Sequence, residues 1–278
     1  MTAQRPGERT SRDIRTVAVT ASSRDLKAHF ARGGKAINGW CSIPSAVTAE
    51  IMAQLFDTVS IDLQHGLMDY QTALSMLQAI DRRAIPTLCR VPWNEPGIIM
   101  KALDAGFTGI ICPMVNTREE AKRFAASCRY APRGTRSFGP TRALAVHGPD
   151  YVRTADDLVT TFAMVETAAA LANLDEILSV DEVDGIYIGP ADLSLSLGYP
   201  PSLLPTDGAV WDAIAEIRVK AKAAGKAAAI HCGSPAMVRD MLAAGFDLAT
   251  LVTDARLFAN ALAAGLNEAR AAAPTTNR

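Results

Sequence analysis

The stretch that decides the fold is GIYIGPAD, residues 185–192, where a short apolar run is followed by Gly189-Pro190 and then by the carboxylate of Asp192. Short apolar runs bounded by Gly and Pro are typical of strands buried in a parallel sheet. The run before it along the chain, TFAMVE at residues 161–166, has the same form and ends in Glu166. The two acids therefore follow the ends of consecutive strands, one β-α unit apart.

The same alternation continues in both directions and predicts repeated β-α units. Strands are expected at Ile37–Ile43, Thr58–Asp62, Thr87–Val91, Gly109–Pro113, Thr161–Val165, Gly185–Ile188, Ala227–His231 and Leu248–Val252. Helices are expected at Ser23–Ala31, Ala46–Gln54, Tyr70–Asp81, Glu95–Ala105, Arg118–Cys128, Ala168–Ser179, Gly208–Ala224, Pro235–Ala244 and Ala255–Ala272. Eight such units predict an α/β protein with a (β/α)₈ TIM barrel. An open doubly wound sheet is the alternative, but no G-x-G-x-x-G follows an early strand.

The domain organisation predicted from composition is simple. Residues 1–22 are polar and Arg-rich and are expected to form a flexible extension, and residues 23–278 form one barrel domain. The segment 130–157, rich in Arg, Pro and Gly, is predicted to be a loop that covers the active site or contacts another subunit.

Charge and cysteine content exclude several classes of protein. The net charge is −1 without a basic patch, so nucleic acid is not expected as a partner. No apolar run is long enough to cross a membrane. The five cysteines are odd in number and form no C-x-x-C pair, which favours free thiols in the cytoplasm over a disulfide or a zinc site.

Glu166 and Asp192 are the candidate metal ligands. Carboxylates that meet at the carboxyl end of a barrel supply the hard oxygen donors that a divalent cation such as Mg²⁺ or Mn²⁺ prefers. Gly189 would let the backbone approach a ligand closely, and the amides of Ala191 and Asp192 could bind a carboxylate. The competing interpretation is that each acid is a helix N-cap.

Three further residues, two near strand ends and one at a helix end, could take part in catalysis. His65 follows the second strand and could act as a general base, or simply bond to a backbone carbonyl. Arg90 closes the third strand and suits binding of a carboxylate or an oxyanion, with an ordinary salt bridge as the alternative. Asp104 ends an apolar helix, where its charge opposes the helix dipole; it could orient His65 or lie on the surface. His231 ends the seventh strand without an assigned role.

Five ordered motifs give the chain a family resemblance over about residues 26–263. It resembles the HpcH/HpaI aldolases, the class II, metal-dependent pyruvate aldolases of the 4-hydroxy-2-oxoheptanedioate and 2-dehydro-3-deoxyglucarate aldolase type. The motifs are DLQHG (62–66), PMVNT with EEA (113–117 and 119–121), YAPRG (130–134), ET with NLDEI (166–167 and 173–177) and DGIYIGPADLS (184–194).

The resemblance implies a barrel that assembles as a hexamer, a trimer of dimers, with the last helix exchanged between subunits. It also implies a divalent cation, Mg²⁺, Mn²⁺ or Co²⁺, bound by Glu166 and Asp192. The resemblance implies that His65 is the base, that Asp104 is an acid that raises the basicity of His65, and that Asp62 is a second aspartate near the base. It implies that Arg90 is the cation that stabilises the enolate, and that the amides of Ala191 and Asp192 bind pyruvate. Trp40 would be an aromatic residue at the mouth of the barrel.

Two positions depart from the family pattern. Gln64 stands where the family often has Glu, and Met164 stands where it commonly has a substrate-contacting Gln. A thioether cannot donate a hydrogen bond, so the substrate contact at Met164 should differ.

The expected reaction is reversible cleavage of a 4-hydroxy-2-oxo acid into pyruvate or hydroxypyruvate and an aldehyde. No lysine lies at an expected strand end, which argues against Schiff-base chemistry. The alternatives are an acyl-CoA lyase of the citrate-lyase β type, a 2-oxo-acid decarboxylase, and an inactive oligomeric protein that binds a metal or an oxo acid.

Overall fold

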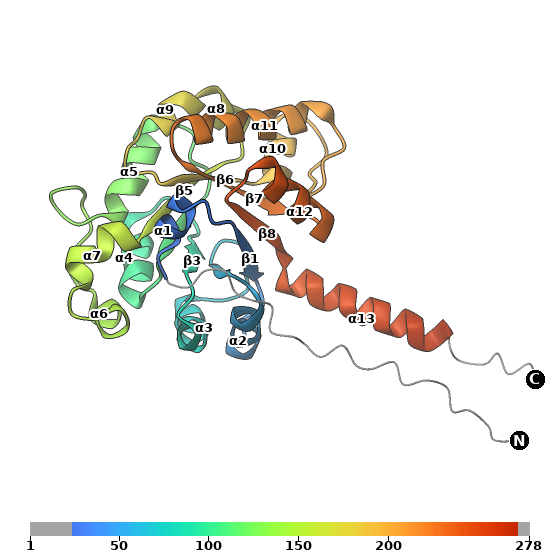
Figure 1. The fold of residues 1–278 in the computed structure, drawn as a ribbon, viewed down its shortest axis with the longest axis horizontal. Coiled ribbons are helices and arrows are strands. Elements are labelled where there is room, and N and C mark those ends of the chain that lie inside the picture. Colours follow the sequence, from blue (N-terminus) through green and yellow to red (C-terminus); the bar gives the residue numbers. More distant parts are fainter. Residues whose placement is uncertain (1–23, 272–278) are drawn as a thin grey trace, which may run out of the picture.

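A closed barrel of parallel strands forms the centre of the molecule (Figure 1). The structure is a computed structural model and describes residues 24–271, so the extension predicted for residues 1–22 lies outside the described residues. The strands follow one another around the barrel in sequence order and confirm the predicted (β/α)₈ fold. They are β1 (Ala36–Cys41), β2 (Thr58–Asp62), β3 (Thr87–Arg90), β4 (Gly109–Cys112), β5 (Thr160–Val165), β6 (Gly185–Ile188), β7 (Ala227–Cys232) and β8 (Leu248–Thr253).

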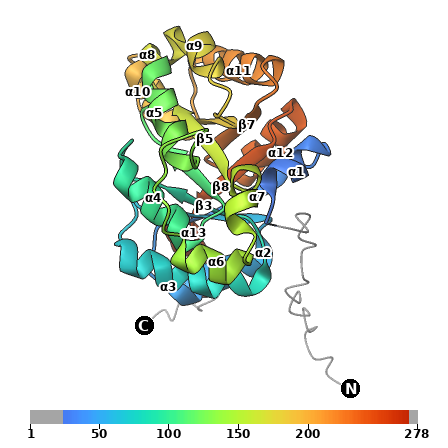
Figure 2. The ribbon, with the colours of Figure 1, turned by 90° about the vertical axis from the view of Figure 1, so that its left-hand side faces the viewer.

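Helices surround the barrel and connect each strand to the next (Figures 1 and 2). Their ends carry ordinary caps, such as the capping box of Thr117 and Glu120 and the left-handed Gly106 and Gly245. The helices are α1 (Leu26–Ala31), α2 (Ala46–Leu55), α3 (Tyr70–Ile80), the 3₁₀ turn η1 (Asp81–Arg83), α4 (Pro96–Ala105), α5 (Arg118–Cys128), α6 (Thr141–His147), α7 (Tyr151–Leu158), α8 (Ala168–Ala172), α9 (Leu174–Leu178), α10 (Pro190–Ser196), α11 (Gly208–Ala223), α12 (Pro235–Ala244) and α13 (Asp254–Ala271).

The sequence prediction was wrong in the segment 130–157, which contains α6 and α7 rather than a continuous loop. Ala143, Tyr151 and Ala155 form a small buried cluster there, so two short helices are stabilised by tertiary packing that leaves little periodicity in the sequence. The helix predicted over residues 168–179 is interrupted at Asn173 and forms α8 and α9. The short helix α10 was not predicted at all.

The interior of the barrel has its own core, separate from the layer between barrel and helices. Trp40, Phe162, Met164 and Tyr187 belong to this inner cluster, together with Leu26 of α1. Because residues that begin strands, such as Ala36 and Leu248, belong to the same cluster, α1 closes the end of the barrel at which the strands start.

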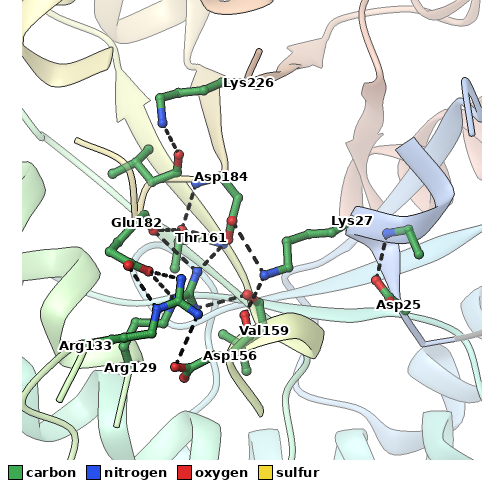
Figure 3. Close-up of polar contacts among 12 residues, drawn as sticks. Asp25, Lys27, Arg129, Arg133, Asp156, Val159, Thr161, Glu182, Asp184 and Lys226 are labelled. Carbon is green, nitrogen blue, oxygen red and sulfur yellow. Dashed lines mark hydrogen bonds and ion pairs between the residues drawn. The ribbon is translucent and has the colours of Figure 1, made fainter. Parts of the chain in front are cut away.

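A buried ion-pair network stabilises that same end of the barrel (Figure 3). Arg129, only 1% exposed, donates to Asp184 at 2.7 Å and to Glu182 at 3.2 Å. Arg133 also donates to Glu182. Asp184 in turn accepts from the backbone N–H of Thr161, the second residue of β5. Arg129 and Arg133 therefore stabilise the end of the barrel where the strands begin.

The helix α13 leaves the barrel after β8 and extends away from it (Figure 1). Every residue from Phe258 to Ala271 is exposed, including the apolar side chains of Phe258, Leu262 and Leu266. Among residues 24–271 there is no helix with the length and apolarity that a membrane span requires. All five cysteines are buried and unpaired in the structure.

Candidate active site

The candidate residues lie where the strands end. Asp62 is the last residue of β2 and Arg90 the last of β3, and the two are paired in the parallel register. Glu166 directly follows β5, and Asp192 lies in α10, which begins after β6 at Pro190. In a barrel of parallel strands all these positions lie at one rim, the usual place for an active site.

Asp62 and Arg90 form a two-pronged pair at this rim. Arg90 Nε donates to Asp62 Oδ1 at 2.8 Å, and Nη2 donates to Oδ2 at 2.5 Å. The backbone N–H groups of Gln64 and His65 also donate to Oδ1. Burial acts to raise the pKa of the Asp62 carboxyl, but the hydrogen bonds and charge of Arg90 outweigh it, and the pKa is lowered. Asp62 is therefore an ionised anchor that holds Arg90 and the turn carrying His65.

Trp40 lies beneath this pair in the barrel interior. Its Nε1 donates to Asp62 Oδ2 at 3.3 Å, and the Arg90 guanidinium carbon lies 4.9 Å from its ring centroid. The indole is 1% exposed. Trp40 thus supports Arg90 from below, and the position at the mouth that the resemblance implies for it stays a prediction.

His231, to which sequence reasoning gave no role, extends this layer. Its ring centroid lies 5.0 Å from that of Trp40, and its Nδ1 lies 3.3 Å from the hydroxyl of Tyr187. Burial, with the nearby charge of Arg90, lowers the pKa of His231 to about 3. The ring is therefore neutral at physiological pH and adds no second charge beside Arg90. Its place at the end of the seventh strand was the signal that could have identified it.

Glu166 is a buried carboxylate, and one of its two oxygens accepts a hydrogen bond from the protein. It is 2% exposed, and its Oε1 accepts a hydrogen bond from the backbone N–H of Met114 at 2.9 Å. Its Oε2 faces Gly189 so closely that a Cβ at Gly189 would lie 2.5 Å from it. Burial and the charge of Asp192 raise the pKa of Glu166 to about 7, although the Met114 N–H and Arg90 act in the opposite direction.

These features fit a divalent cation. Two carboxylates that repel each other, one of them buried with an uncommitted oxygen, gain stability when a cation neutralises them. Across residues 24–271, no three His, Cys, Asp or Glu side chains converge on a common metal position. The described residues would therefore supply two oxygen ligands, as Mg²⁺ sites often do when water and substrate complete the sphere. Asp192 is exposed, in keeping with an accessible site.

His65 and Asp104, which were predicted to act together, contact different partners. His65 is exposed, and its backbone rather than its ring bonds to Asp62. Asp104 pairs instead with Arg136, whose Nη2 donates to Oδ1 at 2.7 Å. No contact between Asp104 and His65 occurs within residues 24–271, so the role of Asp104 in tuning His65 stays a prediction.

The two positions that depart from the family pattern also differ in environment. Met164 is 2% exposed in the inner barrel cluster beside Trp40 and Tyr187. Its methyl group lies 3.2 Å from a Cβ built at Gly189, which places it against the backbone next to Glu166. Gln64 is partly exposed in the turn after β2. Met164 thus presents an apolar surface at the base of the site.

Comparisons with known proteins agree with this fold and identify relatives. The family model described as HpcH/HpaI aldolase/citrate lyase matches residues 41–261. The hydroxypyruvate/pyruvate aldolase of Rhizorhabdus wittichii is 45% identical over 240 residues, which cover 86% of this chain and 96% of that protein. The 4-hydroxy-2-oxo-heptane-1,7-dioate aldolase of Salmonella arizonae is 36% identical over 231 residues, 82% of this chain and 87% of the relative. The crystal structure of an HpcH/HpaI aldolase/citrate lyase family protein from Burkholderia cenocepacia superposes with a TM-score of 0.82, is 29% identical, and covers 89% of this chain and all of that one.

Proposed function

The chain belongs to the HpcH/HpaI aldolase/citrate lyase family, and from that premise we propose that it is a class II aldolase that reversibly cleaves a 4-hydroxy-2-oxo acid to an aldehyde and pyruvate or hydroxypyruvate. The observation that carries the proposal is a cation, Arg90, anchored at the same rim as the buried carboxylate Glu166. This rim can bind an oxo acid and accommodate the negative charge of its enolate.

The metal site is part of the proposal. Glu166 and Asp192 would hold a divalent cation, Mg²⁺, Mn²⁺ or Co²⁺. When bound, such an ion supplies Lewis-acid polarisation of the 2-oxo group and stabilises the charge that develops there. Gly189 keeps space open beside Glu166, and the amides of Ala191 and Asp192 would bind the carboxylate of the oxo acid.

Arg90 would stabilise the enolate oxygen directly. A guanidinium has five N–H groups, of which two donate to Asp62, so three remain available for the substrate. Because Asp62 and Trp40 hold the guanidinium in place, little reorganisation is needed when charge develops. Asp62 acts as a positioning residue in this scheme.

His65 would move the proton. In the cleavage direction its ring takes the proton of the 4-hydroxyl, the C3–C4 bond breaks, and the bonding electrons pass into the enolate as the aldehyde forms. His65 then returns that proton to C3 of the enolate, which gives pyruvate and regenerates the base. The exposed ring of His65 suits this role because a substrate can reach it. Asp104 remains a proposed partner that raises the basicity of His65.

We also propose that the protein forms a homo-oligomer in the cytoplasm. Phe258, Leu262 and Leu266 recur every four residues along α13 and are at least half exposed, so one face of this helix is an apolar surface. We assign that surface to a second copy of the chain, in a hexamer built as a trimer of dimers that exchange α13. Five buried free thiols favour a reducing compartment.

Proton exchange tests the proposed function. The metal-loaded protein is incubated with pyruvate in D₂O, and the methyl signal is followed by NMR. The wild type should exchange the methyl protons through the enolate, Glu166→Ala should abolish exchange, and His65→Ala should slow it. Asp212→Asn, on the exposed surface of α11, is the control that should exchange at the wild-type rate. Absence of exchange in the wild type would favour an inactive binding protein.

A further inference from the structure

A cavity of about 430 Å³ lies at the end of the barrel where the strands begin, opposite the rim of the proposed active site. It is enclosed by α1, by the first residues of β5 and β7, by the loop between α9 and β6, and by the turns after α11 and before β8. Pockets of this size commonly bind small molecules. None of the described residues that we assign to the active site lines it, so a ligand here would bind separately from the substrates.

The cavity contains a buried hydroxyl group without a hydrogen-bond partner. Thr160 lines the cavity and is fully buried, and within residues 24–271 its Oγ1 makes no hydrogen bond. Thr160 and Phe162 lie two residues apart on β5, so both face the barrel interior, where Phe162 belongs to the inner cluster. Because buried polar groups are normally hydrogen-bonded, the hydroxyl of Thr160 is a candidate contact for a ligand.

Lys226 brings a buried positive charge to the same cavity. The residue is 8% exposed, and its Nζ donates to the backbone carbonyls of Val180 at 2.9 Å and Val183 at 2.6 Å. Burial lowers the pKa of Lys226, although the charges of nearby acids oppose this effect. One of these acids, Asp181, also lines the cavity but is exposed, so water screens its charge. The charge of Lys226 is thus compensated only in part, and one of its three N–H groups remains for a ligand.

The other charges that line the cavity are paired with one another. Lys222 donates two hydrogen bonds to Asp247, both at 2.8 Å. Asp184 accepts from Arg129 at 2.7 Å, and Lys27 of α1 approaches it to 3.6 Å from the other side (Figure 3). Since these acids already have cationic partners, Lys226 is the charge in the cavity that favours an anionic ligand.

We propose that this cavity is a binding site for a small organic carboxylate, distinct from the substrates of the enzyme. The carboxylate pairs with the ammonium of Lys226 and accepts a hydrogen bond from Thr160 Oγ1. Phe30 and Ala227 line the cavity and pack against the inner cluster, so they offer an apolar surface to the body of the ligand. The bound ligand joins α1 to the strands that it covers. This inference does not depend on the proposed aldolase activity.

Benzoate and benzamide test the proposal, because they share a ring and differ in charge. Binding to the metal-free protein is measured by titration calorimetry. The wild type should bind benzoate, and should bind benzamide about ten-fold more weakly or less tightly still. Lys226→Met keeps the aliphatic stem but removes the charge, and it should lower the affinity for benzoate about ten-fold or more. Lys122→Met, on the exposed face of α5, is the control and should bind benzoate as the wild type does.

Thr160→Val gives the decisive comparison, because Lys226→Met also removes the bonds to two carbonyls. Valine keeps the shape of threonine and removes a hydroxyl that has no partner in the described part of the fold. The melting temperature should stay the same or rise, while the affinity for benzoate should fall about ten-fold. Wild-type affinity for benzoate in Thr160→Val would overturn the proposal.

A second titration separates this cavity from the rim. Benzoate should bind with the same affinity when Mg²⁺ and pyruvate are present at saturating concentrations. Competition between benzoate and pyruvate would place benzoate in the active site and overturn the proposal, and so would a wild type that does not bind benzoate. Neither result would bear on the aldolase, whose own test is the exchange of pyruvate protons.

Discussion

Arg90 donates two parallel hydrogen bonds to Asp62, from Nε to Oδ1 at 2.8 Å and from Nη2 to Oδ2 at 2.5 Å. The two residues end adjacent strands, so the pair joins β2 to β3 at the rim of the barrel. It also leaves the remaining N–H groups of the guanidinium directed away from Asp62. Asp62 therefore fixes the position of the Arg90 guanidinium and still leaves N–H groups of this cation available to a substrate.

The first prediction concerns this pair. Asp62→Asn keeps the size of the side chain but removes the charge that orients Arg90. It also replaces one of the two oxygens that accept hydrogen bonds from the guanidinium with an NH₂ group. The rate of pyruvate proton exchange should fall about ten-fold or more. Because burial of an unpaired arginine is unfavourable, the melting temperature should fall as well. Asp212→Asn serves as the control, and an unchanged exchange rate in Asp62→Asn would contradict the positioning role.

The second prediction concerns the space beside Glu166. In Gly189→Ala the new Cβ would lie 2.5 Å from Glu166 Oε2, so the carboxylate must move. Affinity for Mn²⁺, measured by titration calorimetry, should fall about ten-fold or more. Gly208→Ala is the matched control, because a Cβ there meets nothing within 4 Å, and it should bind as the wild type does. Equal affinities in the two variants would show that the Glu166 position is not part of the metal site.

The third prediction concerns stability at acidic pH. The pKa of His231 is about 3 in the fold and 6.5 for an unperturbed imidazole. As the pH falls below 6.5, the unfolded chain takes up a proton at this position that the folded chain does not accept until about pH 3. His231 therefore lowers the free energy of unfolding by up to about 1.4 kcal/mol for each pH unit through this window.

His231→Leu removes this contribution. Denaturant unfolding of the metal-free protein at about pH 7 and about pH 5 measures it, and the variant should lose less stability between the two pH values than the wild type. A parallel loss in both proteins would mean that His231 does not remain neutral. Loss of the hydrogen bond to Tyr187 lowers the stability of the variant at both pH values alike, and so leaves the comparison intact.

The fourth prediction concerns assembly. Leu262→Glu places a charge in the apolar face of α13, whereas Asn260→Glu places one on the opposite side of the same exposed helix. Light scattering coupled to size-exclusion chromatography should show an oligomer for the wild type and for Asn260→Glu, and smaller species for Leu262→Glu. A monomeric wild type would rule out the proposed role of α13 in assembly.

Much of the barrel could be predicted from the sequence because its strands are short apolar runs, and several of them end at a charged residue. Asp62, Arg90 and Glu166 stand at such ends, and the structure places all three at the rim. The helices α6 and α7 escaped prediction because they depend on burial of Tyr151 against neighbouring elements rather than on a local pattern.

Other features depend on contacts between distant residues and could not be predicted. Asp104 pairs with Arg136, which is 32 residues away and lies within the segment predicted to be a loop. Met114 adopts a left-handed backbone with φ of 55°, which nothing in its residue type indicates, and its N–H holds Glu166. The burial of Trp40 beneath Arg90 follows from the packing of the whole barrel interior.

The central claim is that Glu166 and Asp192 together hold one divalent cation at the rim. The most direct measurement is titration of Mn²⁺, followed by the electron paramagnetic resonance signal of the free ion, into the wild type, Glu166→Gln and Asp192→Asn. The account predicts one tight site per chain in the wild type and at least about a hundred-fold weaker binding in each variant. Binding of Mn²⁺ with wild-type affinity in either variant would contradict it.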